Sequence, residues 1–231
     1  MERINLDLDN FIYTASHDLR SPITNIEALM NYLEEKLKEE NALSEETKEV
    51  LQRVMDSVNR FKRTIEDLAA ISRLQKDTVE EAAEIVTNIK DVYEDIMADF
   101  DYPNQNACFI QTDFQVRQLN FSKKNFRSIL YNLLSNALKY QANERDCIVH
   151  VTTHLEEPYV VLQVKDNGLG MNPRQQEQLF TMFRRFHDHV EGTGVGLFMV
   201  KRIVDNADGK IEVESEEGEG TTFRVYLQAA M

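Results

Sequence analysis

Residues 159–171 read YVVLQVKDNGLGM, an apolar run that ends in a carboxylate and two glycines. The β-branched and aromatic residues of the run predict a strand, and the five residues Asp166 to Gly170 predict a tight turn directly after it. Glycine lets the backbone turn sharply or approach a ligand closely. Taken alone, this turn has a purely structural interpretation as well as a ligand-binding one.

Further strand and helix patterns surround this run. Strands are predicted at residues 108–114, 118–121, 147–155, 159–165, 210–215 and 221–227, and helices at 84–100, at 122–140 and from about residue 194. Mostly antiparallel strands interleaved with helices predict an α/β sandwich, in which helices cover one face of a mixed sheet. We expect this domain to span residues 75–231.

Two long amphipathic helices are predicted in the first third of the chain. Apolar residues recur there in steps of three and four, at Ile12, Ala15, Leu19, Ile23, Ile26, Met30, Leu33 and Leu37, and then at Leu51, Val54, Val58, Phe61, Ile65 and Leu68. Ser44 can cap the second helix. The fold class is therefore α+β, with a helical hairpin over residues 1–74. Because a hairpin leaves its apolar seam without a cover, we expect a homodimer with a four-helix bundle, and packing against the second domain is the alternative.

Composition excludes several classes of protein. The 231 residues hold 26 Lys and Arg against 40 Asp and Glu, and a net charge of −14 disfavours nucleic acid and anionic lipid surfaces as partners. No uncharged stretch is longer than the 11 residues of 128–138, which is too short to span a membrane, and no signal peptide is visible. We expect a cytoplasmic module without direct membrane contact, and a membrane anchor upstream in a longer protein stays open. Cys108 and Cys147 are expected to be reduced core residues, with no zinc site.

Two more motifs contain groups that suit phosphate or metal. Residues 192–197, GTGVGL, open an apolar helix, whose free N–H groups favour a phosphate, although the motif matches neither the P-loop nor the dinucleotide fingerprint. Asn132, Asn136, Lys139 and Tyr140 lie in steps of three and four on one face of the predicted helix at 122–140. This face is interpreted as an anion or metal site, and a merely solvated face is the alternative.

The order of the motifs resembles a known family. The stretches 132–140 (NLLSNALKY), 166–170 (DNGLG), 180–185 (FTMFRR) and 192–197 are similar, in order and spacing, to the ATP-binding domain of sensor histidine kinases. Upstream, residues 16–22 (SHDLRSP) resemble that family's phospho-acceptor box. The resemblance covers essentially the whole chain. It implies an ATP-dependent protein histidine kinase of two-component signal transduction, on the fold shared with gyrase, Hsp90-type and MutL-type ATPases.

The resemblance also implies a set of ATP-binding residues. They are Asn132, Asn136, Lys139, Tyr140, Asp166, Gly168, Gly170, Phe183, Arg184, Gly192, Thr193, Gly194, Val195, Gly196 and Leu197. By resemblance, Asn136 would ligate Mg²⁺, Asp166 would accept a hydrogen bond from the adenine amino group, and residues 172–191 would form a mobile lid. Arg185 matches the family's phosphate-facing arginine, but the adjacent Arg184 leaves that assignment open.

The identity of residue 132 separates kinase from hydrolase. The related ATPases place Glu four residues before the metal-binding Asn, whereas Asn132 is a neutral amide that cannot act as a base. The resemblance therefore implies His17 as the phosphoryl acceptor, with Asp18 orienting its ring and Ser21 contributing to phosphatase activity on a response-regulator receiver domain. The helical spacing predicts that His17 points away from the apolar stripe, and Pro22 predicts a bend beside it.

Two alternatives stay open at this point. One is a nucleotide-sensing interaction module without useful kinase activity, and the other is a conformational ATPase that hydrolyses its nucleotide. The sequence also leaves open whether phosphoryl transfer runs within one subunit or between the two subunits of a dimer.

Overall fold

The computed structural model describes the backbone of residues 2–39, 43–74, 85–86, 88–100, 108–142, 144–184, 186 and 193–229, and their side chains except those of 2–17, 20, 63 and 66–74. The chain separates into two compact units, residues 1–80 and 81–231. In the described part, no helix is both long and apolar enough to cross a membrane.

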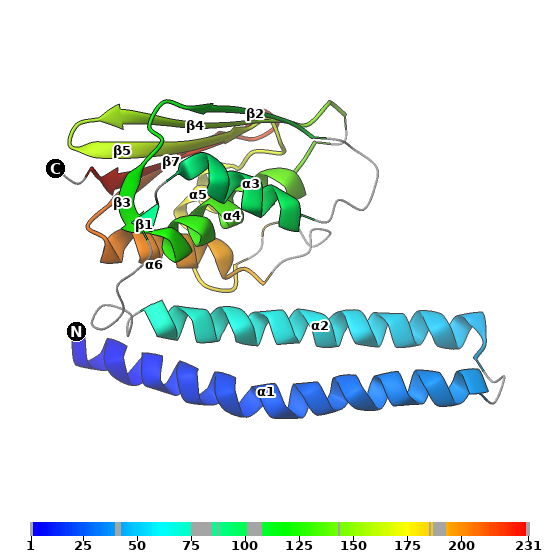
Figure 1. The fold of residues 1–231 in the computed structure, drawn as a ribbon. Coiled ribbons are helices and arrows are strands. Elements are labelled where there is room, and N and C mark those ends of the chain that lie inside the picture. The colour runs from blue at the N-terminus through cyan, green and yellow to red at the C-terminus, as the bar shows by residue number, and fades with distance from the viewer. Residues whose placement is uncertain are drawn as a thin grey trace. The chain divides into compact units, whose positions relative to one another are not determined.

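The first unit is a pair of long helices, α1 (Glu2–Glu39) and α2 (Glu45–Leu74), which lie side by side (Figure 1). Ser44 caps α2 as predicted, because its Oγ accepts a hydrogen bond of 3.1 Å from the N–H of Thr47. Glu45 and Glu46 follow in the first turn, where negative charge complements the helix dipole. α1 stays helical through Pro22, and the bend predicted there stays a prediction.

Only a narrow line of the apolar stripe is buried within the hairpin. Ile23, Val58 and Ile65 form one buried cluster, with exposed fractions of 8%, 8% and 2%. A second line of large apolar side chains is exposed on the same helices, at Leu19, Ile26, Leu29, Leu33, Val50, Val54 and Phe61. The hairpin therefore presents a long apolar surface that its own side chains do not cover.

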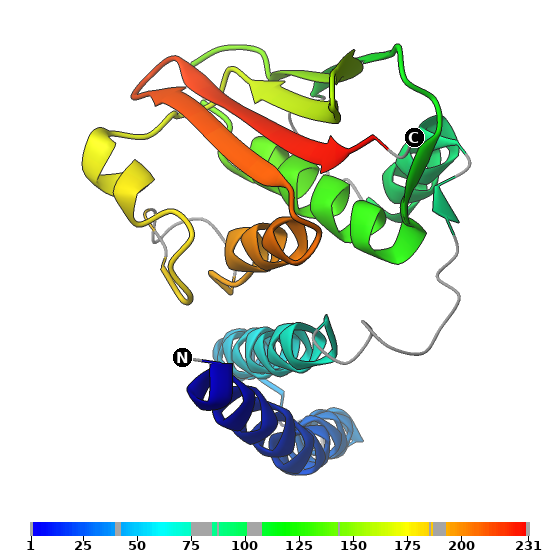
Figure 2. The same cartoon turned by 90° about the vertical axis from the view of Figure 1, so that its left-hand side faces the viewer.

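The second unit is built on one mixed sheet with strand order β2-β4-β5-β7-β6. Its strands are β2 (Phe109–Phe114), β4 (Ile148–Glu156), β5 (Tyr159–Asp166), β7 (Gly220–Gln228) and β6 (Lys210–Glu216). β2 and β4 are parallel, and all other neighbours are antiparallel. Helices α3 (Ile89–Asp99), α4 (Lys123–Lys139) and α6 (Gly196–Asn206) lie on one face of this sheet (Figure 2). The predicted α+β fold class is confirmed.

Helix α4 forms the centre of the core. Ser122 caps it, as predicted, by accepting a 3.4 Å hydrogen bond from the N–H of Asn125. Its inner side chains are almost completely buried, with exposed fractions of 0–1% at Phe126, Ile129, Leu130, Leu133 and Leu134. The facing residues of β4 and β5, among them Val149, Val151 and Val164, are buried to the same degree. α4 is thus held rigidly on the sheet.

The helix predicted at 84–100 is wrong in its first turn. Residues Ile85–Val86 form β1, which pairs with β3 (Leu119–Ser122) in a separate two-stranded sheet. α3 begins only after Asn88, whose side chain accepts a 3.1 Å hydrogen bond from the N–H of Lys90. Val86 is buried in the small sheet. An N-capping residue within the apolar pattern therefore marks the boundary that periodicity alone missed.

The prediction of two reduced cysteines is also wrong, because Cys108 and Cys147 form a disulfide. Each cysteine directly precedes one of the two parallel strands β2 and β4, and their Cα atoms lie 4.6 Å apart. The N–H of Phe109 donates a 2.8 Å hydrogen bond to the carbonyl of Cys147 in the same place. Strand pairing therefore brings together two residues that lie 39 positions apart in the sequence.

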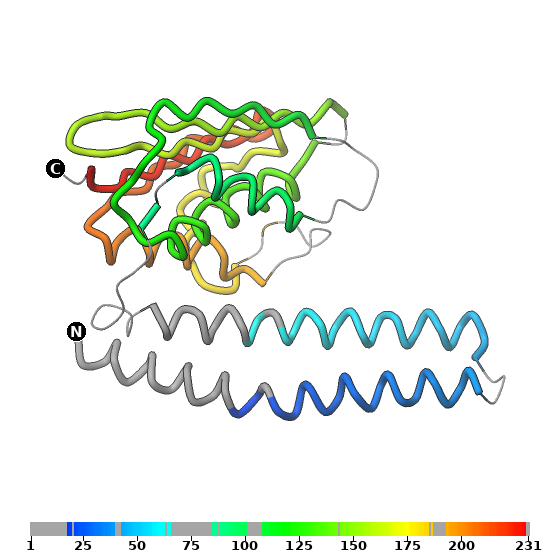
Figure 3. The backbone as a smooth tube through the Cα atoms, in the orientation of Figure 1, coloured from blue at the N-terminus to red at the C-terminus, as the bar shows by residue number. Residues whose placement is uncertain are grey.

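The tight connection between β4 and β5 is seen at the left of the backbone trace (Figure 3).

Candidate functional site

Asp166 ends β5 and begins the loop that connects this strand to α5 (Pro173–Glu177). Its Oδ1 atom accepts hydrogen bonds from the N–H of Gly168, at 2.8 Å, and from the N–H of Thr221, at 3.2 Å. Both bonds use the same oxygen, and Oδ2 takes part in neither. The carboxylate is thus fixed by backbone donors while one oxygen is left for another donor.

Burial raises the pKa of Asp166 to about 6. The two backbone hydrogen bonds and the nearby Arg145 guanidinium oppose this effect, but burial is the larger cause. A half-buried carboxyl with a raised pKa at the end of a strand is typical of a functional site. At neutral pH it is ionised and lacks part of the hydration that it has in the unfolded chain.

Arg145 was not singled out by the sequence, and it ties the loop together. Its Nε donates a hydrogen bond of 2.7 Å to the carbonyl of Asn167, and its Nη2 donates one of 2.7 Å to the carbonyl of Gly168. Nη2 also donates to the carbonyl of Gly218. The N–H of Gly218 in turn donates a 2.7 Å bond to the carbonyl of Leu169. One guanidinium thus joins the loop after β5 to the turn between β6 and β7. A single arginine in a polar segment carries no sequence signal for this role.

Asn167 braces the loop from the other side. Its Nδ2 donates a 2.9 Å bond to the carbonyl of Asp146, and its Oδ1 accepts a 2.9 Å bond from the N–H of Ile148. Both bonds go to backbone groups beside the start of β4. Asn167 therefore acts as a structural residue within the Asp-Asn-Gly motif.

Gly168 and Gly170 are required by close backbone contacts. A Cβ atom at Gly168 would overlap the carbonyl oxygen of Tyr140, and one at Gly170 would overlap that of Glu216. Gly170 also has a φ of +65°, which other residues adopt only with strain. The N–H of Leu169 donates a 2.9 Å bond to the carbonyl of Tyr140. The glycines thus let the loop pack directly on the C-terminal end of α4.

The polar face of α4 lies beside this loop. Asn132 donates from Nδ2 to the carbonyl of Ser128 at 2.8 Å, and its Oδ1 lies where a Cβ atom at Gly196 would be. Asn136 is half-buried, and no hydrogen bond of its side chain falls within the described part of the chain. Lys139 is exposed in the last turn, and Tyr140 is the C-cap. The amide of Asn136 is thus available for a ligand.

The glycine-rich segment meets α4 at the start of α6. Helix α6 begins at Gly196, two residues after the predicted start, and Val195 at its N-cap makes no side-chain capping bond. Thr193 and Gly194 precede it, and Gly194 has a φ of +72°. Because Gly196 lies against Asn132, the amide groups that open α6 lie next to the polar face of α4. Gly192 lies outside the described residues.

The predicted lid, residues 172–191, is described as far as Arg184 and at residue 186. It begins with α5, whose N-terminus is capped by a capping box: the side chains of Asn172 and Gln175 each accept a hydrogen bond from the backbone N–H of the other residue. Phe183 has a φ of +64°, and its N–H donates a 2.9 Å bond to the carbonyl of Gly194. Arg184 is exposed, and Arg185 lies outside the described residues. The mobility expected of this segment stays a prediction.

The predicted phospho-acceptor box lies on α1. The backbone of His17 is helical, and Asp18, Ser21 and Pro22 are exposed. The predicted outward direction of the His17 side chain lies outside the described residues. Across the described part of the chain, no group of three or more His, Cys, Asp or Glu side chains could hold a metal ion.

Comparison with known families assigns both units. Residues 7–77 match the family model of the His Kinase A (phospho-acceptor) domain, and residues 122–231 match that of the histidine kinase-, DNA gyrase B- and HSP90-like ATPases. A phospho-acceptor hairpin followed by an ATPase-type domain defines one class of signalling protein. The chain belongs to the sensor histidine kinases of two-component systems.

Curated relatives and solved structures agree with this assignment. The phytochrome-like protein Cph1 of Synechocystis is 29% identical over 96% of this chain, and the sensor histidine kinase YvrG of Bacillus subtilis is 29% identical over 98%. The chain spans only 29% and 39% of the lengths of these two relatives. Full-length ShkA, solved in complex with AMPPNP, shares the fold with a TM-score of 0.71 at 21% identity, over 96% of this chain and 47% of ShkA. Acinetobacter baumannii AdeS matches with a TM-score of 0.63 at 19% identity, over 93% and 98% of the two chains.

The loop contacts predict that Gly170→Ala destabilises the protein far more than Gly218→Ala. Both glycines have a positive φ, but a Cβ atom at Gly218 meets nothing within 4 Å. We expect a loss of about 1–2 kcal/mol for Gly218→Ala from backbone strain alone, and of more than about 3 kcal/mol for Gly170→Ala, which also collides with the backbone. Urea unfolding followed by circular dichroism measures both. Equal losses would show that the Glu216 contact does not constrain the loop.

The raised pKa predicts that Asp166→Asn stabilises the protein at neutral pH. The folded pKa of about 6 lies above the ordinary aspartate pKa of 3.8, so the free-energy cost of ionisation is absent below about pH 4, grows between pH 4 and 6, and is complete above pH 6. We expect Asn, a neutral acceptor, to raise the free energy of unfolding by about 1–3 kcal/mol at pH 7 and by much less at pH 4.5. The exposed Asp146→Asn serves as control, with a change within about 0.5 kcal/mol at either pH. A gain for Asp166→Asn that does not depend on pH would contradict the explanation.

Proposed function

We propose that this chain is an ATP-dependent protein histidine kinase core, which autophosphorylates His17 with Mg-ATP and passes the phosphoryl group to an aspartate of a response-regulator receiver domain. The observation that carries this proposal is the presence, in one chain, of a phospho-acceptor domain that contains His17 and an ATPase-family domain. We propose residues 1–74 and 75–231 as the functional boundaries of the two domains.

The adenine base is assigned to Asp166. Its Oδ2, which neither backbone hydrogen bond uses, would accept a hydrogen bond from the exocyclic amino group. This hydrogen bond would replace part of the hydration that the carboxylate loses on burial. Gly168 and Gly170 would let the base lie against the loop backbone. The ShkA structure was determined in complex with AMPPNP, an ATP analogue, which supports a nucleotide at this fold.

The triphosphate is assigned to the polar face of α4 beside the start of α6. The uncapped N–H groups at the start of α6, together with Thr193 and Gly194, suit an anion. Gly192, Val195, Gly196 and Leu197 would border the phosphates, and Lys139 and Tyr140 would approach them from α4. Phe183, Arg184 and Arg185 would contribute from the lid, with one of the arginines stabilising charge on the transferred group.

The residues present fit a magnesium ion that is held mainly by the phosphates of its substrate. Among the described residues no group of three or more His, Cys, Asp or Glu side chains could hold a metal ion by itself, and Mg²⁺ commonly takes few protein ligands and is held largely by phosphates and water. The available amide oxygen of Asn136 would be its protein ligand, with Asn132 assisting. A bound Mg²⁺ would offset negative charge on the phosphates.

His17 is the proposed acceptor because residue 132 is a neutral amide, which cannot act as a base for water. Asn132 takes the place where hydrolytic relatives carry Glu, and its Nδ2 is bonded to the carbonyl of Ser128. A neutral ring nitrogen of His17 would attack the γ-phosphorus, the bond from this phosphorus to the bridging oxygen would break, and ADP would leave. Asp18 would orient the ring and assist removal of its proton. Ser21 is exposed on the same helix and is proposed to position water for dephosphorylation of the regulator.

A second copy of the chain is the proposed cover of the apolar hairpin. The exposed apolar line runs along both α1 and α2, as a four-helix bundle requires. We expect Ile26→Asp and Phe61→Asp each to raise the dimer dissociation constant by at least about 10-fold, because each removes apolar burial and introduces a charge. Analytical ultracentrifugation measures the constant. Leu155→Asp, at an exposed leucine on β4, is the matched control and should leave it unchanged; a dimer that survives both hairpin substitutions would place the interface elsewhere.

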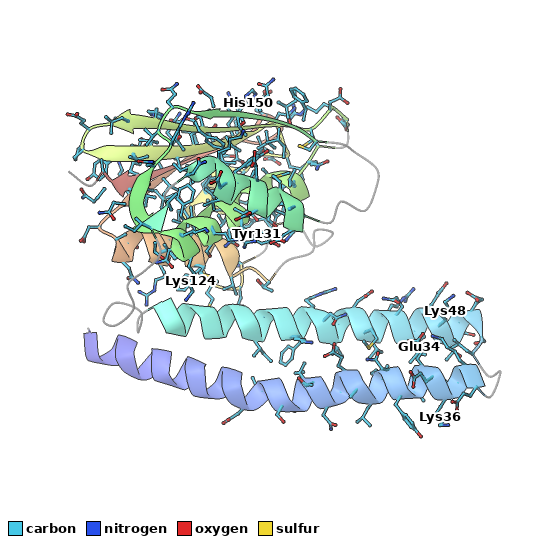
Figure 4. All side chains as sticks on the ribbon, viewed as in Figure 1. Glu34, Lys36, Lys48, Lys124, Tyr131 and His150 are labelled. Carbon is cyan, nitrogen blue, oxygen red and sulfur yellow. A yellow bond between two sulfur atoms is a disulfide. The ribbon has the colours of Figure 1, made fainter. Side chains whose placement is uncertain are left out.

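Labelling with γ-³²P-ATP tests the kinase assignment directly. We expect His17→Ala to abolish acid-labile protein labelling, and Asn136→Ala to lower its rate by about 100-fold or more through loss of the metal ligand. The matched control is His150→Ala, because this histidine projects from the face of the sheet that no helix covers (Figure 4).

Three other results would point away from the proposal. Label retained by His17→Ala would defeat the assignment of the acceptor. Phosphate release that does not depend on His17 would indicate a hydrolytic ATPase. Tight ATP binding without any phosphoprotein would indicate a nucleotide-sensing module.

A further inference from the structure

The disulfide lies at the edge of the sheet, and one of its two cysteines is partly exposed. β2 is an edge strand, with β4 as its only neighbour in the sheet. Cys108, directly before β2, is half-buried, whereas Cys147, directly before β4, is 5% exposed. Cys108 is therefore the more exposed of the two cysteines, and the one that a small thiol or disulfide would reach first.

The residues on both sides of Cys147 hold the loop that follows Asp166. We call residues 145–148 the brace. Arg145 donates to the carbonyls of Asn167 and Gly168, and the carbonyl of Asp146 accepts from Nδ2 of Asn167. The N–H of Ile148 donates to Oδ1 of Asn167, whose own N–H donates back to the carbonyl of Ile148 at 3.3 Å. Five hydrogen bonds thus connect the brace to residues 167 and 168, and the disulfide crosses it at Cys147.

We propose that Cys108 and Cys147 are a reversible thiol–disulfide site that sets the affinity of the Asp166 loop for nucleotide. This inference rests on the proposed function, because it regulates the same site. The disulfide fixes the brace to the start of β2, and the brace fixes the loop whose carboxylate and glycines receive the base. In the dithiol form the brace loses its covalent tether, so the loop is less well ordered before ATP binds. Part of the conformational entropy is then lost during binding, which lowers the affinity for ATP.

The exchange needs only a low-molecular-weight disulfide, RSSR, and its thiol. The Cys108 thiolate attacks one sulfur of RSSR and RS⁻ leaves, which forms a mixed disulfide. The Cys147 thiolate then attacks the Cys108 sulfur and displaces the second RS⁻. The two protons lost by the cysteines end on the two released thiols, so the sum is one protein disulfide and two RSH from one RSSR, and excess RSH reverses it. The protein dithiol is oxidised and RSSR is reduced.

Calorimetry on the full chain in defined redox states tests the coupling. The protein is equilibrated with oxidised or reduced glutathione, its thiol state is read by mass spectrometry after alkylation, and ATP is titrated into each form. We expect the disulfide form to bind ATP at least about 5-fold more tightly. Circular dichroism of the reduced form establishes that it is folded.

Two variants separate the coupling from a merely structural cross-link. With Cys108→Ser and Cys147→Ser together, we expect the affinity of the dithiol form whichever glutathione is present. Arg145→Met keeps the disulfide but removes three hydrogen bonds to the loop and its turn, so its two redox forms should bind ATP almost equally.

The outcomes distinguish the inference from the proposed function. Equal affinity of the two wild-type forms, or a difference that persists in the double serine variant, would overturn the inference and leave the kinase assignment in place. A redox difference undiminished in Arg145→Met would overturn the route through the brace. Absence of ATP binding in both forms would overturn the proposed function, and the coupling with it.

Discussion

Burial of one side of α4 against the sheet positions the parts of the candidate site that come from separate regions of the second unit. The side chains on the inner face of this helix, among them Phe126 and Leu134, are excluded from solvent. Close packing therefore fixes the position and the rotation of the helix on the sheet. Its outer side then presents Asn132 beside Gly196 and the start of α6, and its last carbonyl, that of Tyr140, receives the N–H of Leu169. A helix that both fills the core and contacts two glycine-rich segments makes the geometry of the site a consequence of core packing.

Signals that act over a few residues made much of this arrangement predictable. The capping serines at 44 and 122 and the β-rich composition of β4 and β5 each depend on neighbouring residues, and each corresponds to an observed feature. Two of the features that the sequence missed required long-range information. Cys108 meets Cys147 only because β2 and β4 run parallel, and Arg145 reaches Gly218 across 73 residues. No local pattern encodes such a contact, because it exists only after the sheet has formed.

The loop after β5 gives up stability in two ways. A carboxyl whose pKa is raised to about 6 by burial is ionised at neutral pH at a cost in free energy. Gly170 is held at a positive φ against the backbone of Glu216, and glycine loses more conformational entropy on folding than other residues. Such costs concentrate where a ligand must be received. This favours the ligand-binding interpretation of the Asp-Asn-Gly-Leu-Gly turn over the structural one, which the sequence could not decide.

The proposed division of labour explains why a neutral amide suits residue 132. A site that held ATP next to a general base would lose the nucleotide to water before any protein acceptor could react. With Asn132 in that position and its amide bonded to the backbone of Ser128, bound ATP would lack an activated nucleophile of its own. Phosphoryl transfer would then require a nucleophile from another part of the chain, and His17 of the phospho-acceptor domain would supply it. Under this proposal, a nucleotide site that is separate from the acceptor would make phosphoryl transfer depend on the approach of one domain to the other.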